Sequence, residues 1–442
     1  MSMFRAVREF PIALRLLFIN QFGVDIGFCV LIPFLAQYLE QNLGMSAALV
    51  GLVLGVRNLS QQGLFVAGGT AADRLGARTV IVAGCVLRTA GFALLAFGNS
   101  LPFLVAASVC SSLAGALFYP AVRTYVAQEM GDRQPEAFAL LNVFATSGWL
   151  IGLLLGSLLF LVDLRVCALA VSAFFTLLTV AQALTLPASA VTPASETVLA
   201  DWREALGNRR FLCFTLATTG MVTMENQLFV LLPEGARTAS GWEGGAGLLL
   251  ASGAVAHLFL QLPITRSLER HGGGARWLSA GIALIGIGFV PPLLICTAAR
   301  PTGPGEGIPR LAVMITGALI LYAGGMIAYP AAMEAIPRFG RERLTGTYFG
   351  LFYMLSGTAA VGGNAVVGWT MDLAECSRRP WLPWLCCLAF GMASAVAMGW
   401  LYRARVLPRG PVVTPAPIAS GPARLLPGPA PAPDGVREQP PR

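Results

Sequence analysis

Residues 68–84 read GGTAADRLGARTVIVAG, a stretch in which a short polar centre separates two apolar ends. Glycines flank the charged residues of this centre, and such a pattern is typical of a tight turn between two apolar segments. We interpret it as the point where the chain leaves a membrane and re-enters it. The residues of interest are Gly69, Asp73, Arg74, Gly76 and Arg78.

Composition supports a membrane protein. The 442 residues are 56% hydrophobic and 12% charged, with a mean hydropathy of +0.69, whereas soluble domains carry about 25% charged residues. The net charge of +8 comes from arginine, because the chain has no lysine. A lysine-dependent phosphate-binding loop is therefore excluded. The nine cysteines show no metal-type spacing, so we expect no metal and no cofactor.

Apolar runs of about 20 residues, the length needed to cross a bilayer, recur along the chain. The sequence therefore predicts an all-α integral membrane protein with twelve transmembrane helices in two pseudo-symmetric six-helix bundles. The predicted helices lie near 11–39, 46–70, 78–98, 101–128, 136–162, 165–186, 208–235, 243–269, 275–299, 310–336, 342–371 and 380–403.

These helices divide the chain into four parts. A polar, uneven linker separates two groups of six helices, and eleven prolines among the last 35 residues predict a disordered tail. The parts are a first bundle at 1–186, a cytoplasmic linker at 187–207, a second bundle at 208–405 and the tail at 406–442.

Arginines indicate the orientation of the helices. Eighteen arginines fall in the terminal segments and loops of one side, and six fall in the loops of the other. Cytoplasmic loops carry the excess of basic residues in membrane proteins. We therefore expect a multi-pass protein with both termini in the cytoplasm.

The two groups of six helices contain an internal repeat, which favours a transporter over a membrane enzyme. VDIGFCVLIP at 24–33 aligns with MENQLFVLLP at 224–233, and AGALFYP at 114–120 aligns with GGMIAYP at 324–330. GGTAADRLGAR aligns with ITRSLERHGGGAR at 264–276. The alignments place Asp25 on Glu225, and Asp73, Arg74 and Gly76 on Glu269, Arg270 and Gly272.

Charged residues inside the predicted helices form a second group of candidates. An ionisable side chain at bilayer depth costs at least ~2.5 to 3.5 kcal/mol and is normally paired or functional. Asp25 and Glu225 could each carry a proton or attract the amine of a cationic substrate; alternatively, Asp25 forms a fixed ion pair with Arg57. The full set of proton or substrate candidates is Asp25, Arg57, Gln61, Arg88, Glu225 and His257.

The loop residues Gly69, Asp73, Arg74, Gly76 and Arg78 match the loop signature of the major facilitator superfamily. The wider stretch VGLVLGVRNLSQQGLFVAGGTAADRLGARTVIVAGCVLRTAGFALLAFG resembles the MdtH-type multidrug-efflux branch, whose members are drug:proton antiporters of the bacterial inner membrane. The family's arginine on helix four has no counterpart, because Ser111 stands there. The glycine stripe expected on helix five is kept as Gly148, Gly152 and Gly156.

The resemblance implies a conformational latch. Asp73 is expected beside the start of helix eleven, near Arg341 and Arg343, where free N–H groups favour an anion. Arg74 and Arg78 are expected to pair with Glu129. The repeat extends the latch to Glu269, Arg270 and Gly272. The alternative is that these charges only anchor loops to the membrane surface.

Together these features predict a secondary transporter, not an enzyme, that exports lipophilic drugs by proton antiport through alternating access and so contributes to antibiotic resistance. Its partners would be a small lipophilic substrate, protons and the lipid bilayer, with no nucleic acid, and it would act as a monomer. An exporter of a metabolite such as a sugar or siderophore is the main alternative. A membrane sensor or enzyme is disfavoured, because no effector domain or reactive cluster is evident.

Overall fold

The computed structural model describes most of the chain, and all structural statements below concern these parts. The predicted tail, the side chain of Arg57, the surroundings of Gly156 and the whole of Gly272 lie outside this description. The described residues are 3–37, 47–97, 101–159, 164–187, 197–271, 275–298, 301 and 303–407.

Within these ranges the fold is helical, and no strand is present. The first half of the chain holds α1 (Met3–Arg8), α2 (Ile12–Gln37), α3 (Ala47–Leu75), α4 (Ala77–Phe97), α5 (Leu101–Glu129), α6 (Gln134–Leu159) and α7 (Leu164–Thr185). The second half holds α8 (Val198–Gly207), α9 (Arg209–Asn226), α10 (Leu231–Ser240), α11 (Gly244–Arg270), α12 (Ala275–Ile287), α13 (Val290–Ile295), α14 (Pro304–Ala335), α15 (Thr345–Ser377) and α16 (Leu382–Arg403). Short 3-10 turns are η2 (Gly131–Arg133), η3 (Ile336–Phe339) and η4 (Glu342–Leu344).

Every range predicted as a membrane helix contains a helix. Seven stretches of the described chain are long and apolar enough to cross a membrane, so a multi-pass membrane protein is supported, while the count of twelve spans stays a prediction. The seven are Ala77–Leu94, Ala168–Thr185, Gly244–Arg270, Arg276–Ile295, Gly305–Phe339, Glu342–Ser377 and Leu382–Arg403.

Proline divides two of the predicted helices. Proline lacks an N–H group, and its ring clashes with the carbonyl group four residues earlier. Pro291 stands at the start of α13, and α12 ends four residues before it, at Ile287. Pro233 stands in the first turn of α10, after α9 has ended at Asn226. Each pair of helices occupies the place of one predicted helix.

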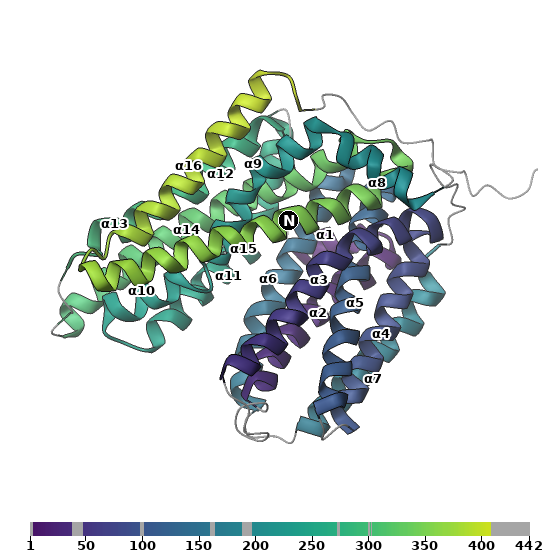
Figure 1. Ribbon diagram of the computed structural model, residues 1–442, viewed down its shortest axis with the longest axis horizontal. Helices are drawn as coiled ribbons and strands as arrows, with labels where there is room; N and C mark the ends of the chain where they lie inside the picture. Colours follow the sequence, from purple (N-terminus) through teal and green to yellow (C-terminus); the bar gives the residue numbers. More distant parts are fainter. Residues whose placement is uncertain are drawn as a thin grey trace, which may run out of the picture.

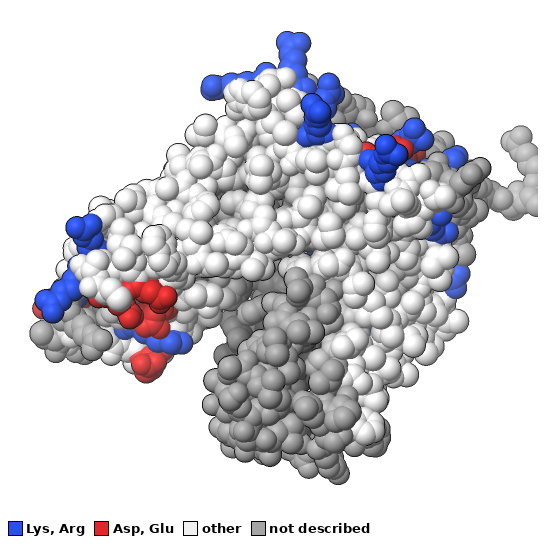
Figure 2. All heavy atoms as spheres, in the orientation of Figure 1, with Lys and Arg blue, Asp and Glu red and all other residues white. Residues whose placement is uncertain are grey.

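The helices form two groups, α2–α7 and α9–α16, which meet near α8 and diverge away from it (Figure 1). Between the groups, α3 packs along α15, and α6 packs against α11 and α14. Figure 2 shows a broad uncharged band on one face, with arginines and acids gathered at its ends, as expected for a surface that faces lipid.

Glycines allow the closest approach between the groups. A β-carbon on Gly69 would overlap the carbonyl oxygen of Gly346, and a β-carbon on Gly346 would overlap that of Gly69. The backbones of α3 and α15 therefore touch directly, because glycine has no side chain to keep them apart. Gly76 has φ +86°, a left-handed conformation that lets α3 end and α4 begin within one residue.

The predicted glycine stripe lies on α6. A β-carbon on Gly148 would overlap the carbonyl oxygen of Phe22, so this glycine lets α6 approach α2. Gly152 is also buried.

The predicted linker contains helix α8, which the sequence analysis did not anticipate. Thr197 caps this helix, because its side chain accepts a hydrogen bond from the Ala200 N–H. Asp201, in the first turn, is buried against the first bundle. The linker is therefore a structural bridge between the bundles.

Candidate functional site

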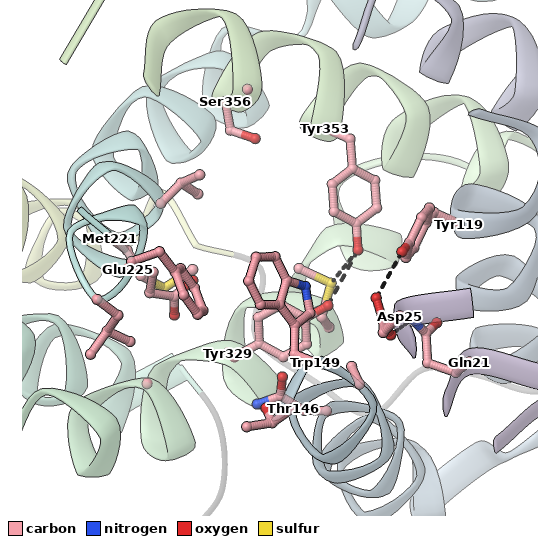
Figure 3. A pocket seen from close by; sticks show the side chains of 18 of the residues that line it. Gln21, Asp25, Tyr119, Thr146, Trp149, Met221, Glu225, Tyr329, Tyr353 and Ser356 are labelled. Atoms are coloured by element: carbon pink, nitrogen blue, oxygen red, sulfur yellow. Dashed lines mark hydrogen bonds between the residues drawn. The ribbon is translucent and has the colours of Figure 1, made fainter. Parts of the chain in front are cut away.

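A cavity of about 440 Å³ lies between the two groups of helices, a size typical of sites for small molecules. Polar and aromatic side chains from both groups face it (Figure 3). The lining includes Gln21, Asp25, Gln61, Gln62, Phe65, Tyr119, Arg123, Asn142, Trp149, Met221, Glu225, Phe229, His257, Tyr322, Tyr329, Met333, Tyr353 and Ser356.

Asp25 reaches this cavity from α2 and is buried, with 5% of its surface exposed. Each of its carboxylate oxygens accepts a hydrogen bond. Gln21 Nε2 donates to Oδ2 at 2.6 Å, and the Tyr119 hydroxyl donates to Oδ1 at 3.1 Å. Hydrogen bonds donated to both oxygens favour the ionised form of the Asp25 carboxylate. Whether Arg57 also pairs with Asp25 stays a prediction.

Arg123, on α5, was missed by the sequence analysis. Its guanidinium donates to the Gln21 side-chain oxygen at 3.1 Å, the Tyr353 hydroxyl at 2.9 Å and the Tyr329 hydroxyl at 3.3 Å. It also lies 5.0 Å from the centre of the Tyr119 ring. Ser111 stands where the family has its arginine, but the same helix carries Arg123, an arginine inside an apolar run that the buried-charge rule should have flagged.

Glu225 lies in the last turn of α9 and also lines the cavity. Within the described part of the chain, no side chain donates a hydrogen bond to its carboxylate or forms an ion pair with it. Its neighbours include Met221 and Gly325, where an added β-carbon would lie 3.3 Å from Oε1. The rings of Trp149 and Phe229, with centres 4.3 Å apart and planes tilted by 35°, face the same space. The carboxylate is thus available to a ligand or a proton.

The structure brings two further candidates to the cavity and leaves one outside it. Gln61 lines the cavity, and His257 Nε2 lies 2.9 Å from Asn142 Nδ2 on the opposite group of helices. Arg88 lies instead inside the first group, 5.3 Å from the Phe118 ring centre and 5.5 Å from that of Phe175. Its 5% exposure makes it a buried cation within the bundle.

Asp73 of α3 joins the two groups of helices by binding the start of α15. Its two carboxylate oxygens accept hydrogen bonds from the backbone N–H groups of Gly346 at 2.7 Å and Thr347 at 2.6 Å. These N–H groups belong to the first turn of α15, where unpaired donors and the helix dipole favour an anion. The expected position of Asp73 at the start of helix eleven is confirmed. Its function as a latch stays a prediction.

Of the two arginines near Asp73, Arg74 contacts the linker and Arg78 contacts another helix of the first bundle. Arg74 forms an ion pair with Asp201 of α8 at 2.6 Å, a partner that the sequence analysis did not name. Arg78 donates to the carbonyl oxygen of Ala183 at 2.6 Å. Glu129 is exposed at the end of α5, and it lines a small surface hollow together with Arg78. The pairing of these arginines with Glu129 stays a prediction.

The equivalent end of the second bundle uses different residues. Arg266 of α11 forms an ion pair with Glu136, in the first turn of α6, and Arg133 binds the same carboxylate at 2.9 Å. Glu269 and Arg270 are exposed at the end of α11. At this end of α11, Arg266 therefore joins the helix to the opposite bundle, and the repeat alignment did not select it.

Known proteins resemble this chain over most of its length. A model of the Major Facilitator Superfamily matches residues 17–363. The uncharacterized MFS-type transporter Rv0849 of Mycobacterium tuberculosis is 40% identical over 366 residues, which cover 82% of this chain and 86% of that protein. Multidrug resistance protein MdtH of Escherichia coli is 29% identical over 387 residues, which cover 87% of this chain and 93% of MdtH.

Solved structures show the same fold. The human organic anion transporter MFSD10 (TETRAN) superposes with a TM-score of 0.66 at 16% identity, covering 87% of this chain and 98% of that one. A peptide transporter POT gives a TM-score of 0.65 at 14% identity, covering 90% and 96%. The two groups of helices, the match to the family model and the likeness to Rv0849 lead to one conclusion. The chain belongs to the major facilitator superfamily of membrane transporters.

Proposed function

We propose that the protein exports lipophilic small molecules across the membrane in exchange for protons. The observation that carries this proposal is the cavity between the bundles, which is lined by two acids. Asp25 accepts two side-chain hydrogen bonds, whereas Glu225 has no partner among the described side chains. Asp73 joins the bundles at the start of α15. An acid that alternates between proton and ligand, exposed to one compartment at a time, is sufficient for antiport.

The captured state in this proposal is closed toward the cytoplasm and open toward the outside. The excess of arginines lies on the side of α8 and the Asp73 contact, which supports a cytoplasmic location for that side. The termini and the linker then also lie in the cytoplasm. In the opposite state, Asp73 leaves the first turn of α15 and the bundles part on that side.

The cavity lining supports a substrate with apolar surface. Aromatic rings and methionine dominate the space around Glu225, and such surfaces adapt to ligands of different shape. The relative MdtH is described as a multidrug resistance protein, which agrees with this substrate class. A cationic substrate would gain from the carboxylate of Glu225, which has no partner among the described side chains, and from the π-faces nearby.

The direct test is drug accumulation in bacteria that express the chain, with and without an uncoupler that collapses the proton gradient. We expect expressing cells to accumulate less of at least one lipophilic drug than cells with an empty vector, and we expect the uncoupler to abolish the difference. Equal accumulation of every tested drug in all conditions would refute export by antiport.

The alternative substrate class is a polar metabolite. The side chains of Gln61, Gln62 and Asn142 add hydrogen-bonding groups to the lining, which favours this alternative to a limited extent. Proteoliposomes that contain the purified protein, loaded with a panel of sugars and siderophores beside lipophilic drugs, distinguish the two classes.

A further inference from the structure

We propose that Arg123 transmits the charge state of Asp25 to the contact between the two bundles. This inference rests on the proposed antiport function and identifies Arg123 as the positioning residue that links proton binding to closure. It depends on one connected set of hydrogen-bonded side chains, which runs from the carboxylate through Gln21 and Arg123 to two tyrosines. Figure 3 labels Asp25, Gln21, Tyr329 and Tyr353 of this set.

The guanidinium of Arg123 joins the bundles directly. It comes from α5 in the first group, yet two of its three hydrogen-bond partners are Tyr353 of α15 and Tyr329 of α14 in the second group. The two tyrosine hydroxyls lie 3.4 Å apart, so one planar cation bridges a pair of acceptors. Separation of the bundles at this level requires these bonds to break.

The same guanidinium depends on Asp25 through Gln21. The Gln21 side chain presents its oxygen to Arg123 at 3.1 Å and its NH₂ group to Asp25 at 2.6 Å. This orientation of the amide serves a cation on one side and an anion on the other. Gln21 therefore links the carboxylate of Asp25 to the guanidinium of Arg123 through its two hydrogen bonds.

A proton on Asp25 removes the negative charge that compensates Arg123. Arg123 is 4% exposed, and a buried charge that loses its counter-charge is strongly destabilising. The protonated acid must also donate a hydrogen, and the Tyr119 oxygen can accept it only if the Tyr119 hydroxyl turns its own hydrogen away from Asp25. The closed arrangement therefore weakens, because the guanidinium gains free energy by reaching water as the bundles part.

Two buried cations act on Asp25 in the described part of the chain, Arg123 and Arg88. Arg88 of α4 contacts the rings of Phe118 and Phe175 inside the first bundle, and among the described residues it forms no hydrogen bond or ion pair with the second. From α6, Gly148 packs against Asp25 and brings no charge, because it has no side chain. Arg123 is the cation that both approaches Asp25 through Gln21 and crosses between the bundles.

The test is a double-mutant cycle read by hydrogen–deuterium exchange of the purified protein in nanodiscs at one pH. The four proteins are the wild type, Asp25→Asn, Arg123→Gln and the double variant. Asp25→Asn imitates the neutral acid. We expect it to accelerate exchange at the end of α3 and the start of α15 by about tenfold. We expect the double variant to exchange no faster than Arg123→Gln alone.

The proposal is overturned if Asp25→Asn accelerates exchange by the same factor in the wild type and in the Arg123→Gln background. If Arg123→Gln does not fold, Gln21→Leu replaces it, because this change cuts the link to Asp25 and leaves the bonds to the tyrosines; the same non-additivity is expected. Arg123→Lys, which keeps the charge but not the fork of donors, should restore only part of the protection.

Thr176→Val serves as the matched control, because it removes a hydroxyl that donates to the Ser172 carbonyl oxygen within α7, a helix with no described residue in the cavity lining. Its exchange at α3 and α15 should equal that of the wild type. The cycle needs no substrate, so its result is separate from the transport assay. A wild type that moves no tested drug contradicts the proposed function, whereas additive exchange effects contradict only the role of Arg123.

Discussion

The two acids of the cavity come from equivalent positions of an internal repeat, but their surroundings differ. Asp25 has Gln21 one turn before it, and Arg123 lies on a neighbouring helix. The alignments that pair Asp25 with Glu225 and Tyr119 with Tyr329 place Met221 opposite Gln21 and Met333 opposite Arg123.

In the second bundle, therefore, methionines stand where the first bundle has its amide and its cation. The duplicated site has divided into an acid with internal partners and an acid that faces the cavity without one among the described residues. We infer that the first is suited to conformational coupling and the second to a ligand.

The largest effect is expected from Asp25→Asn. The neutral amide cannot exchange a proton, so uphill export should fall by at least about tenfold while binding of substrate persists. Glu225→Gln should show the opposite pattern, with weakened binding of a cationic substrate and continued transport of an uncharged one. Transport and binding measured in proteoliposomes check both. Identical phenotypes for the two variants would break the proposed division of roles.

The next effect concerns the contact at the start of α15. Asp73→Asn replaces a charged acceptor of two backbone N–H groups by a neutral one. A hydrogen bond to a charged group contributes about 1.5–3 kcal/mol, so we expect the closed state to lose about tenfold or more in population. Transport should fall at unchanged membrane content, as judged by immunoblot of isolated membranes. Normal transport by a well-inserted variant would remove the latch from the mechanism.

A smaller effect is expected at the corresponding contact of the other bundle. Arg266 and Glu136 form a partly exposed ion pair, with side-chain exposures of 29% and 11%. Pairs of this kind contribute about 1 kcal/mol or less, and Arg133 still neutralises Glu136 in Arg266→Gln. Transport should therefore decrease by no more than about fivefold. A loss of transport as large as that of Asp73→Asn would show that the Arg266–Glu136 contact controls closure as strongly as the Asp73 contact.

The smallest effect should follow Met221→Gln, which restores the symmetry of the two acids. The new amide stands one turn before Glu225, as Gln21 does before Asp25, and can donate to its carboxylate. Competition from this hydrogen bond should weaken the binding of a cationic drug by about two- to fivefold. Fluorescence or calorimetric titration measures the change. Tighter binding would contradict the view that Glu225 binds the drug because no described side chain pairs with it.

The sequence predicted the architecture well, because the apolar runs, the repeat and the glycines act locally. Gly69 and Asp73 occupy the expected places, since a close helix crossing and an anion at a helix start each have a recognisable signature. Gly76 likewise marks the junction between α3 and α4.

Other features depend on contacts between distant segments. Arg123 was visible as a charge inside an apolar run, but its partners on α14 and α15 lie more than 200 positions away. Arg74 was expected near Glu129, and its bond to Asp201 requires a helix in the linker. Thr197, which caps α8, was a local signal for that helix. The packing of α8 against α3 was not predictable from a single sequence.

The backbone contact between Gly69 and Gly346 has a consequence for the membrane itself. Two helices that meet without intervening side chains leave no room for a file of water molecules between them. Protons move along such files of water. The contact between α3 and α15 should therefore prevent protons from crossing there without binding to Asp25. We expect these two glycines to limit the leakage of protons along the contact between α3 and α15.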